Sequence, residues 1–366
     1  MKIEIITKIG KNYGALLQAY ALKTVFCSQG AECQVIRFEL DSTQKTYRVC
    51  REPWRRRGIL CNLQSIIHYK EYKESSNKCL EFRNQYYNLT RPYHTFDELC
   101  KTPPEGDIFV SGSDQVWNPR ISFNPAYYCM FAKKGSKLAS YAASIGVSKI
   151  DESIKNEFIS RLSNFNYISV RESSAKELLE QFGIHADVAP DPTLLLTKDE
   201  WSDISANVVE DPYILCYFVA FPKEAPEIVK AIKKEIGIKV VNLMTSEDSS
   251  VIGDIKIRNA GPQEFLGLFK NATFVITSSF HGTVFSIINR KPFLSTLYSI
   301  TGSRVADLLK SVSLEDRIYS QSATTYGLDY FRAANIYTDT VERQIKDLRS
   351  NGIRVIKKIM EENSER

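Results

Sequence analysis

The sequence predicts an α/β protein built from two domains that face a cleft, and three observations support this prediction. The chain has 366 residues, which is more than one hydrophobic core usually organises. It opens with a strand-like run at 2–7, a segment of helical periodicity at 15–30 and a second strand-like run at 32–40. The alternation starts again at 212–221, "PYILCYFVAF". Strands that alternate with helices are typical of parallel sheets.

The first domain is expected to cover residues 1–198. Its later part has three more strand-like runs and two helical segments, at 107–114, 137–144, 166–172, 152–165 and 173–183. The segment "VAPDPTLLL" at 188–196 reads as the strand and turn that finish the domain, because its two prolines break any helix.

Residues 42–105 interrupt this pattern and are expected to form a basic, helical insertion on the first sheet. The stretch "KTYRVCREPWRRR" at 45–57 holds six basic residues and one acidic residue, and 58–87 has a helical pattern. A charge run is usually a solvated surface. This one, with Trp54, also suits attraction to an anionic lipid or to a diphosphate on an acceptor.

The second domain is expected to cover residues 199–366. It begins with a linker, "DEWSDISA", at 199–206. Further strands and helices are predicted at 239–244, 274–279, 223–236, 261–272 and from 283 onward. The last helix, at 341–362, is a candidate to pack back on the first domain.

The composition excludes several classes of protein. A net charge of +5 is too mild to predict a nucleic-acid binder. The eight cysteines form no C-x-x-C pair, so no zinc site is expected, and nothing else requires a metal. The N-terminus lacks the apolar run of a signal peptide, and no run is long enough to cross a membrane. We therefore expect reduced thiols in a cytoplasmic protein. The Walker A, G-x-S-x-G and H-E-x-x-H motifs are absent.

His281 is the leading candidate for chemistry. It follows the buried run "FVIT" with Ser278 and Ser279, and Gly282 leaves room at the start of a helix that is predicted from Thr283. The free N–H groups and the dipole of a helix start favour an anion. An isolated histidine is more often a capping or core residue, but this strand–turn–helix context favours a functional one.

Arg171 occupies the same topological position in the first domain, between "YISV" and a helix that starts near Ser173 or Ser174. Its fork of donors fits a carboxylate or a phosphate. The alternative is a surface arginine that pairs with Glu172 or Asp187.

A dense polar cluster, "FVSGSDQVWNP", follows the strand-like run at 107–114. Asp114 could accept a proton or hold a sugar hydroxyl, and Trp117 could stack on a sugar ring. The alternative is an Asx turn with a buried tryptophan. The sequence favours function for Asp114 and leaves both interpretations open for Trp117.

Two weaker signals lie in other predicted loops. In "KNYGALLQAYAL", Asn12 and Gly14 precede or begin a helix and Gln18 lies one turn inside it, but the spacing does not fit a dinucleotide-binding G-x-G-x-x-G. In "SYAASIG", Ser144 and Gly146 follow another strand.

Taken together, several segments resemble the polysaccharide pyruvyl transferase family: "NYGALLQAYAL", "SGSDQVWN", "SYAASIG", "SVRESSAKELL", "DPTLLL", "GPQEFLGLFKNATFVITSSFHGTVFSIINRKPF" and "SRVADLLKSVSLEDR". The resemblance extends from near residue 8 to about residue 317, and it covers 42–105 poorly. The block around "SSFHGT" is the most specific, and "GSDQVWN" comes next.

The resemblance implies two Rossmann-like domains in a GT-B-like arrangement, phosphoenolpyruvate as donor, a sugar as acceptor and no cofactor. The product would be a cyclic pyruvate ketal across two sugar hydroxyls, with phosphate released, in cell-surface or capsular polysaccharide biosynthesis. Family members carry a histidine and an arginine that engage the donor. These map onto His281 in "SFHG" and Arg171 in "SVRE", and Phe280 would contribute mainly its backbone.

The residues agree with this chemistry, because phosphoenolpyruvate needs an anion site and a donor fork. We expect His281 to donate a proton to the methylene carbon or to bind the phosphate. Asp114 would orient the acceptor or take its proton, and Arg171 would hold the carboxylate or phosphate. The remaining residues are expected to bind the donor (Asn12, Gly14, Ser279, Phe280, Gly282 and Thr283) or the acceptor (Gln115, Trp117 and Ser144).

Two other classes remain open. A GT-B glycosyltransferase that uses a nucleotide sugar would share the architecture and the strand-end anion sites. A non-catalytic scaffold of a polysaccharide assembly complex would use 45–73 as its partner surface, although the retention of His281, Arg171 and Asp114 argues against it. A lipid-linked acceptor would bring the protein to the inner face of the membrane.

Overall fold

The structure, a computed structural model, describes residues 1–39, 67–245, 251–297, 302–320 and 336–361. The basic stretch 45–57 and Trp54 lie outside the described residues. The chain divides into two compact units, which we call unit 1 and unit 2. Unit 1 comprises Met1–Thr46, Arg83–Leu196 and Lys346–Arg366, and unit 2 comprises Tyr47–Phe82 and Thr197–Ile345.

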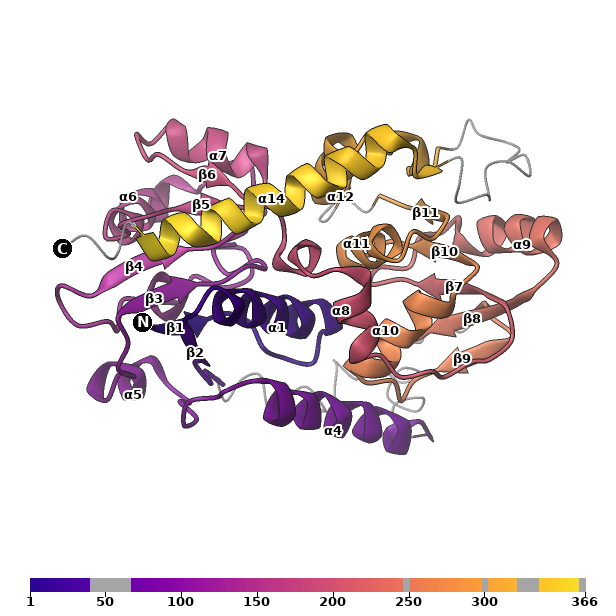
Figure 1. Ribbon diagram of the computed structural model, residues 1–366, viewed down its shortest axis with the longest axis horizontal. Coiled ribbons are helices and arrows are strands. Elements are labelled where there is room, and N and C mark those ends of the chain that lie inside the picture. Colours follow the sequence, from indigo (N-terminus) through magenta and orange to yellow (C-terminus); the bar gives the residue numbers. More distant parts are fainter. Residues whose placement is uncertain (40–66, 246–250, 298–301, 321–335, 362–366) are drawn as a thin grey trace. The chain divides into compact units, whose positions relative to one another are not determined.

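A parallel four-stranded sheet with the order β2-β1-β3-β4 forms the centre of unit 1 (Figure 1). The central strand β1 (Lys2–Ile6) pairs with β2 (Glu32–Val35) on one side and with β3 (Ile108–Ser111) on the other, and β4 (Lys137–Ser140) follows. β3 is buried along its whole length, as is typical of a strand covered on both faces.

Two short parallel strands, β5 (Ser169–Val170) and β6 (Asp187–Val188), continue this sheet. Isolated bridges join β4 and the residues after it to β5, including one between Ala143 and Val170. On the opposite edge, Leu89 and Tyr93 bridge to Val35 and Phe38. Residues 87–93 therefore extend the sheet of unit 1, whereas we expected all of 42–105 to be an insertion.

The helices of unit 1 begin where polar side chains cap them. Asn12 caps α1 (Tyr13–Ser28), Thr95 and Glu98 form a capping box on α5 (Phe96–Lys101), and Asp151 caps α6 (Glu152–Leu162). The other elements are α7 (Ser173–Glu180), the 3₁₀ turns η2 (Pro125–Tyr128) and η3 (Pro192–Leu195), and the unit 1 part of α14 (Asp339–Glu361).

The final helix makes specific contacts in unit 1 through its residues after Ile345. Arg349 donates to the carbonyls of Leu194 and Leu196 at 3.2 and 3.0 Å, and Lys358 Nζ lies 2.9 Å from the carboxylate of Asp187. These bonds attach the later part of α14 to residues 187–196, which include β6 and η3.

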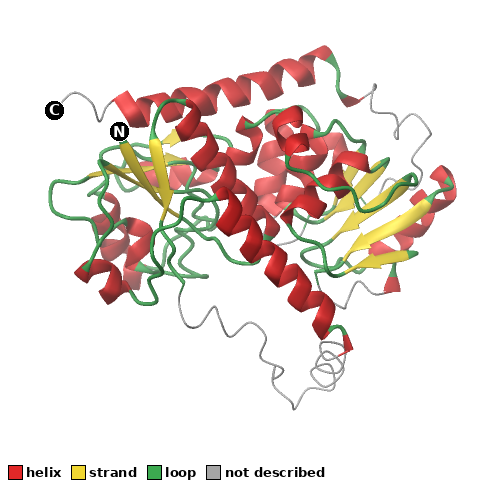
Figure 2. Ribbon diagram, turned by 60° about the horizontal axis from the view of Figure 1, so that its bottom comes forward, coloured by secondary structure: helices red, strands yellow, loops and turns green. Residues whose placement is uncertain are grey.

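Unit 2 contains a parallel five-stranded sheet with the order β11-β10-β7-β8-β9, whose strands are labelled in Figure 1. Figure 2 shows strands in yellow and helices in red. Three strands lie near their predicted positions: β7 (Tyr213–Tyr217), β8 (Lys239–Leu243) and β10 (Phe274–Thr277). The edge strands β9 (Ile255–Ile257) and β11 (Phe293–Ser295) were not predicted. Each spans three residues, which is too short for a periodicity to be recognised.

The helices of unit 2 include one where we expected a linker. Residues 199–206 contain most of α8 (Lys198–Asp203), because Thr197 and Glu200 form a capping box at its start. The linker prediction was therefore wrong. The other helical elements are α9 (Ala225–Ile236), α10 (Pro262–Asn271), α11 (Phe280–Ile288), α12 (Gly302–Ser311) and η5 (Glu315–Arg317).

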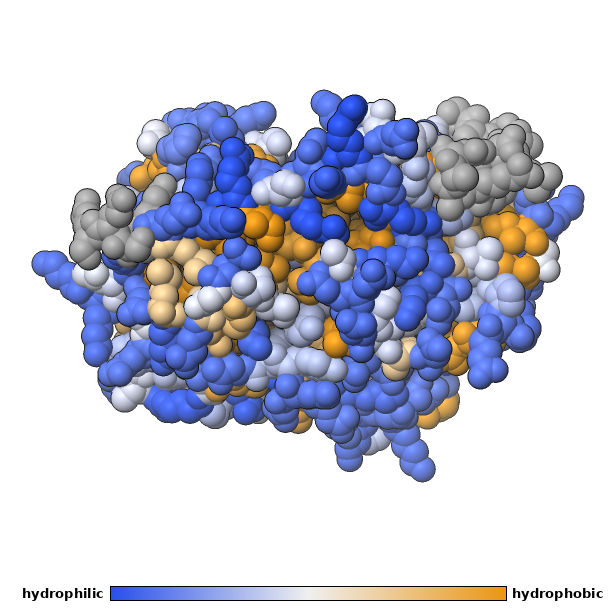
Figure 3. All heavy atoms as spheres, viewed as in Figure 1, coloured by the Kyte–Doolittle hydropathy of each residue, from blue (hydrophilic) through white to orange (hydrophobic). Residues whose placement is uncertain are grey.

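The helix α4 (Tyr69–Tyr86) has residues in both units. Within unit 2, Ser75 donates to the carbonyl of Ala260, and Lys78 Nζ lies 2.7 Å from Glu264. Within unit 1, the residue that follows α4 is Tyr87, and its hydroxyl donates to the carbonyl of Leu16. Polar side chains cover most of the face shown in Figure 3, with apolar side chains in smaller patches.

Candidate active site

The segment that holds His281 follows β10, the neighbour of the central strand β7 in the unit 2 sheet. β7 pairs with β8 on one side and with β10 on the other, so the strand order reverses between β7 and β10. In open parallel sheets, ligands bind beyond the carboxyl ends of the strands at such a point. Ser278 and Ser279 follow β10 directly, and Ser278 Oγ donates to the carbonyl of Ala220, beyond the end of β7, at 2.7 Å.

Ser279 sets the start of α11. Its backbone is extended and its hydroxyl accepts a hydrogen bond from the Gly282 amide at 3.3 Å, so the helix begins at Phe280. We predicted the helix from Thr283, and this was wrong because the serine cap starts it earlier. His281 therefore lies inside the first turn, where the backbone is helical, and its side chain is buried, with 8% exposed.

The helix start packs directly against the strand before it. Thr277 Oγ1 donates to the carbonyl of Tyr217 at 2.7 Å and accepts from the Ser279 amide at 3.0 Å. A Cβ atom on Gly282 would overlap this hydroxyl, so the close approach requires glycine. Thr283 Oγ1 completes the junction by a 2.8 Å contact with the Ser295 hydroxyl on β11.

A buried arginine lies near this junction in unit 2. Arg304, on α12, is buried, and its guanidinium carbon lies 5.9 Å from the centre of the Phe280 ring. The Phe280 ring is in turn edge-on to the His281 ring, with 5.2 Å between centroids. A buried arginine is expensive to desolvate, so such a residue pairs with a carboxylate or binds an anion. Sequence analysis missed Arg304, because one arginine in "SRVADLL" looks like a surface residue.

In unit 1, polar side chains gather beyond β1 and β3, where the strand order also reverses. Thr7 Oγ1 donates to the carbonyl of Ser113 at 2.8 Å, and Lys8 Nζ donates to the carbonyl of Gln115 at 2.7 Å. Because these bonds join the loops after two neighbouring strands, they hold the segment 113–115 in place. Lys8 is a second residue that sequence analysis missed.

Asp114 has a left-handed backbone, with a φ angle of 70°. Its carbonyl accepts from the amides of Val116 and Ser144, at 2.8 and 2.9 Å, which stabilise this conformation. Aspartate and asparagine tolerate positive φ better than other residues with a side chain. Asp114 and Gln115 are partly exposed, so both side chains can reach a ligand.

Arg171 is buried among carboxylates. Its Nη1 donates to Asp191 Oδ2 at 2.8 Å, and its Nε and Nη2 each lie 3.3 Å from Glu172 Oε1. Ser144 Oγ donates to the same Glu172 oxygen at 2.5 Å, and Ser113 Oγ donates to Asp191 Oδ2 at 3.3 Å. Burial lowers the pKa of Arg171, but the nearby carboxylates together outweigh this, so the pKa is raised. The alternative was a surface arginine that pairs with Glu172 or Asp187. Arg171 does pair with Glu172, but it is buried, and its second partner is Asp191 and not Asp187.

Trp117 is a core residue. Its ring is fully buried and stacks on Tyr128 with 5.8 Å between centroids, and its indole N–H donates to the carbonyl of Tyr127 at 3.0 Å. An enclosed ring has no face on which a sugar could stack. The prediction that Trp117 contacts the acceptor is therefore wrong, and the alternative of a buried tryptophan holds.

The remaining candidates have supporting roles in unit 1. Asn12 Oδ1 accepts from the Ala15 amide as the cap of α1, and Gly14 is buried in its first turn. Gln18 Nε2 donates to Thr7 Oγ1 at 3.0 Å, which ties α1 to the end of β1. Gly146, with a φ angle of 64°, lies against the amide pair of Gln115 and Asn118, where a Cβ atom would be 2.7 Å from each side chain.

The candidates therefore form two groups, each inside one unit. Unit 1 brings together Asp114, Gln115, Ser144 and Arg171, and unit 2 brings together Ser279, Phe280, His281, Gly282 and Thr283.

The family model for polysaccharide pyruvyl transferase matches residues 12–299, which include both groups. The chain belongs to the polysaccharide pyruvyl transferase family. The resemblance found in the sequence is confirmed by this match. A search of curated proteins gives no match to this member of the family.

Solved structures similar to this polysaccharide pyruvyl transferase family member share its fold at low sequence identity. The UDP-GlcNAc 2-epimerase from Methanocaldococcus jannaschii is 14% identical with a TM-score of 0.52, over 99% of this chain and 100% of that chain. The epimerase from Neisseria meningitidis, bound to UDP-GlcNAc, is 11% identical with a TM-score of 0.52, over 99% of both chains. These similarities confirm the predicted fold class, α/β with two Rossmann-like domains of the GT-B-like type.

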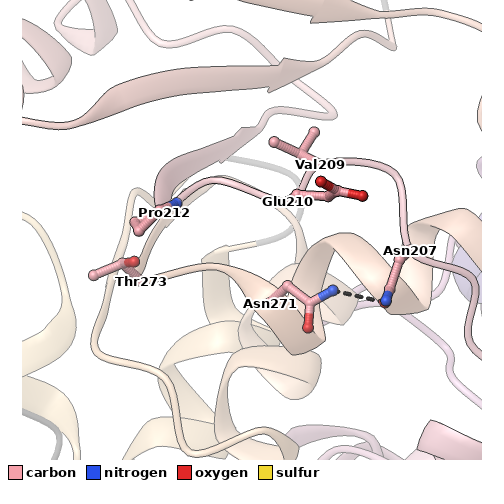
Figure 4. A pocket seen from close by; sticks show the side chains of 6 residues that line it. All are labelled: Asn207, Val209, Glu210, Pro212, Asn271 and Thr273. Atoms are coloured by element: carbon pink, nitrogen blue, oxygen red, sulfur yellow. Dashed lines mark hydrogen bonds between the residues drawn. The ribbon is translucent and has the colours of Figure 1, made fainter.

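A hollow of about 400 Å³ in unit 2 lies away from the residues described above (Figure 4). Pro212 and Thr273 line it, and they precede β7 and β10, whereas His281 follows β10. The hollow is thus at the amino ends of the strands, opposite the edge where ligands bind in parallel sheets. Among the described residues, no cluster of side chains suits a metal ion, and no helix is both long and apolar enough to cross a membrane.

Proposed function

We propose that this protein transfers the pyruvate moiety of phosphoenolpyruvate to a sugar acceptor as a cyclic ketal and releases phosphate, in the biosynthesis of a cell-surface or capsular polysaccharide. The observation that carries the proposal is the junction of β10 with α11. It presents a helix start, a buried histidine and a nearby buried arginine in a member of the polysaccharide pyruvyl transferase family.

The donor is assigned to unit 2. Phosphoenolpyruvate carries a phosphate and a carboxylate, and the amides at the start of α11 favour an anion. His281 lies in this first turn, and Arg304 adds a cationic group near Phe280. We infer that these two side chains bind the donor at the start of α11. The amides of Gly282 and Thr283 are already bonded to Ser279, so these residues contribute through the helix dipole and the close packing of the junction. Asn12 and Gly14, which were also predicted to bind the donor, lie at the start of α1 in unit 1 and are not part of this assignment.

The acceptor is assigned to unit 1. Asp114 and Gln115 offer a carboxylate and an amide that are partly exposed, and these groups suit sugar hydroxyls. Ser144 lies behind them, with its hydroxyl bonded to Glu172. Asp114 would orient one acceptor hydroxyl and take its proton, and Gln115 would orient the other.

Arg171 has a different role in this proposal from the donor clamp that the family resemblance implies. Its charge is already balanced by Glu172 and Asp191. Contact with an anionic donor would add a further negative group to a site that holds two carboxylates. We therefore assign Arg171 to the positioning of these carboxylates, and through Glu172 and Ser144 to the shape of the acceptor site.

The proposed reaction breaks two bonds of the donor, the π bond between C2 and the methylene carbon and the bond between C2 and the phosphate oxygen, and it forms one C–H and two C–O bonds. A proton is added to the methylene carbon, which becomes a methyl group, and C2 acquires positive character. One acceptor hydroxyl attacks C2 and loses its proton, and the bond between C2 and the phosphate oxygen breaks. The second hydroxyl then closes the ring and gives its proton to the departing phosphate. His281 would donate the first proton or stabilise the departing phosphate. The reaction needs no electron carrier, because it transfers protons and a pyruvyl group and no hydride.

The test is to incubate the protein with phosphoenolpyruvate and candidate glycans and to look by mass spectrometry for an added pyruvate ketal, with phosphate release measured in parallel. In a companion experiment, thermal stability is measured with phosphoenolpyruvate and with nucleotide sugars. Stabilisation by phosphoenolpyruvate alone supports the proposal. Stabilisation by a nucleotide sugar alone, with no ketal formed on any glycan, would favour a glycosyltransferase.

We further propose a lipid-linked acceptor at the inner face of the membrane, on the basis of the basic stretch 45–57. The measurement is sedimentation with vesicles that contain anionic lipid, for the full chain and for a chain without 45–57. Equal binding of both chains would remove this part of the proposal and leave the ketal chemistry untouched.

A further inference from the structure

Two arginines share one carboxylate beyond the carboxyl end of β2, outside the residues that the proposed reaction uses. Arg37 Nη2 lies 3.1 Å from Glu39 Oε2, and Nη2 of Arg83, in the last turn of α4, bonds to Glu39 Oε1. All three residues belong to unit 1. The side chain of Arg37 is 30% exposed, whereas those of Glu39 and Arg83 are 16% and 11% exposed. The cluster is therefore largely enclosed and is most accessible to solvent at Arg37.

The cluster holds more hydrogen-bond donors than Glu39 uses. A guanidinium carries five N–H donors, and both arginine side chains contact Glu39 through Nη2. Within the described residues, the Nε atoms of Arg37 and Arg83 are both buried and have no hydrogen-bond partner. Buried polar groups are nearly always hydrogen-bonded, so two such donors in one cluster call for an explanation. Because both groups are donors on cations, the partner that they suit is an anion.

The charges of the three side chains lead to the same conclusion. Burial raises the pKa of Glu39, but the hydrogen bonds and charges of Arg83 and Arg37 outweigh this and lower it, so Glu39 is ionised at neutral pH. Two guanidinium groups and one carboxylate then leave this triad with a net positive charge. A structural ion pair would be complete with one arginine on the carboxylate. The second arginine and the two Nε donors therefore suit a further anion.

The triad lies close to the segment 113–115, which we assign to the acceptor. The Ile36 amide donates to the carbonyl of Ile5 at 2.8 Å, so Arg37 leaves the sheet beside the end of β1. Thr7, which follows β1, bonds in turn to the segment 113–115 after β3. Neighbouring strands are about 5 Å apart, so the backbone of Arg37 is roughly 10 Å from this segment. That separation is comparable to the distance between the far hydroxyls of a hexose and a diphosphate on its anomeric carbon.

We propose that Arg37 and Arg83 bind the diphosphate group of the acceptor, so that the enzyme selects a glycan still attached to its diphosphate. Glu39 holds the two guanidinium groups through Nη2, and each of them can then contact one phosphoryl group. The assignment of this anion to the acceptor rests on the proposed pyruvyl transfer, whereas the anion site itself does not.

The first experiment titrates the full chain with inorganic pyrophosphate by isothermal titration calorimetry. We expect Arg37→Gln and Arg83→Gln each to weaken binding at least about tenfold, since each removes charged hydrogen-bond donors. Each variant leaves Glu39 with one arginine, and circular dichroism checks that it is folded. Arg354→Gln is the matched control, because Arg354 is exposed on α14 in the same unit, bonds to Asn351 and carries the same charge. It should bind pyrophosphate as the wild type does.

Glu39→Gln should have the opposite effect. It removes the negative charge that competes with the ligand, so we expect pyrophosphate to bind at least about threefold more tightly. Glu157→Gln removes a carboxylate from Arg161 elsewhere in unit 1 and should leave the affinity unchanged. Absence of pyrophosphate binding to the wild type would overturn the site. Unchanged affinity in both arginine variants, or a Glu39→Gln variant that binds no more tightly, would also overturn it.

The second experiment offers one glycan with and without a diphosphate on its anomeric carbon in the ketal assay. In the wild type, we expect the KM for the diphosphate form to be at least about tenfold lower, and Arg37→Gln should remove most of this difference. The KM for phosphoenolpyruvate should stay the same in that variant. Equal KM values for the two glycans in the wild type, or a raised KM for phosphoenolpyruvate in Arg37→Gln, would overturn the acceptor assignment. If no glycan is pyruvylated, the proposed function and the acceptor assignment fail together, and the pyrophosphate titration still decides the anion site.

Discussion

Arg171 Nη1 donates to Asp191 Oδ2 at 2.8 Å, and the two side chains are 3% and 0% exposed. Asp191 Oδ1 also accepts from the amide and the hydroxyl of Thr193, at 3.1 and 2.7 Å. The carboxylate therefore links the loop after β5 to the start of η3. A buried ion pair with this many partners fixes geometry, whether or not it adds net stability.

We predict that Arg171→Met destabilises unit 1 by about 3–5 kcal/mol, because it leaves buried carboxylates without their cation. The measurement is urea unfolding followed by circular dichroism. Arg171→Lys is the matched variant, since it keeps the charge and loses the fork. In that variant we expect the KM for the acceptor to rise while the affinity for phosphoenolpyruvate is unchanged. A loss of donor affinity in Arg171→Lys would restore the donor-clamp role that the family resemblance implies.

Replacement of His281 by Ala should lower the rate of phosphate release by on the order of 10²–10⁴-fold, which is the usual value of a positioned proton donor. The midpoint of thermal unfolding is measured on the same samples, so that a folding defect is recognised. His185, which is exposed in unit 1, provides the control, and His185→Ala should keep normal turnover. Near-normal turnover in His281→Ala would remove this histidine from the mechanism.

Two substitutions at Asp114 separate its charge from its backbone. Asp114→Asn keeps a residue that tolerates a φ angle of 70°, so we expect wild-type stability with strongly reduced ketal formation. Asp114→Ala should additionally cost about 1–2 kcal/mol of folding free energy, because alanine is disfavoured in the left-handed region. The two free energies of unfolding and the two rates are compared directly. Full activity in Asp114→Asn would show that the carboxylate is dispensable.

Gly282→Ala should destabilise unit 2 by about 1–3 kcal/mol, since the new methyl group would overlap the Thr277 hydroxyl. Gly10→Ala is a suitable comparison, because nothing lies within 4 Å of its Cβ position. We expect its unfolding free energy to match that of the wild type. If both variants unfold at the same urea concentration, the junction between β10 and α11 is looser than the structure shows.

We predict that Glu4 makes the free energy of unfolding depend on pH. Its side chain is fully buried on β1, and burial raises the pKa of this carboxyl to about 7, above the ordinary value of 4.5. A raised pKa means that the folded state retains the proton longer, so this term is favourable at low pH and is lost as the pH rises from about 4.5 to 7. Glu4→Gln should therefore raise the melting temperature more at pH 8 than at pH 5. The gain at pH 8 is on the order of 3 kcal/mol. An equal gain at both pH values would contradict this.

The sequence was sufficient to predict the elements whose boundaries depend on local chemistry. The apolar run at 274–277 and the amphipathic pattern of α9 lie where they were predicted. Prediction failed where a cap decides the outcome, as when Ser279 starts α11 earlier than expected and Thr197 converts a predicted linker into α8. It also failed for β9 and β11, which depend on neighbouring strands for their hydrogen bonds.

Within the candidate site, it was easier to predict which residues follow the strands than to predict which side chains surround them. His281 and Arg171 were singled out because each follows a buried strand, and both do lie there. Nothing in the sequence indicates that Asp191, twenty residues further along the chain, neutralises Arg171. Trp117 illustrates the same limit, since only the packing of Tyr128 against it shows that its ring is enclosed. Long-range pairings of this kind require coordinates.

The charges near Arg171 have a consequence for substrate choice. Glu172, Asp191 and Asp114 supply three carboxylates, against the two cations Arg171 and Lys8. An excess of negative charge would repel a uronic acid and favour a neutral hexose or an amino sugar. If pyruvyl transfer occurs as proposed, the enzyme should introduce the acidic group into its glycan rather than extend one that is already acidic.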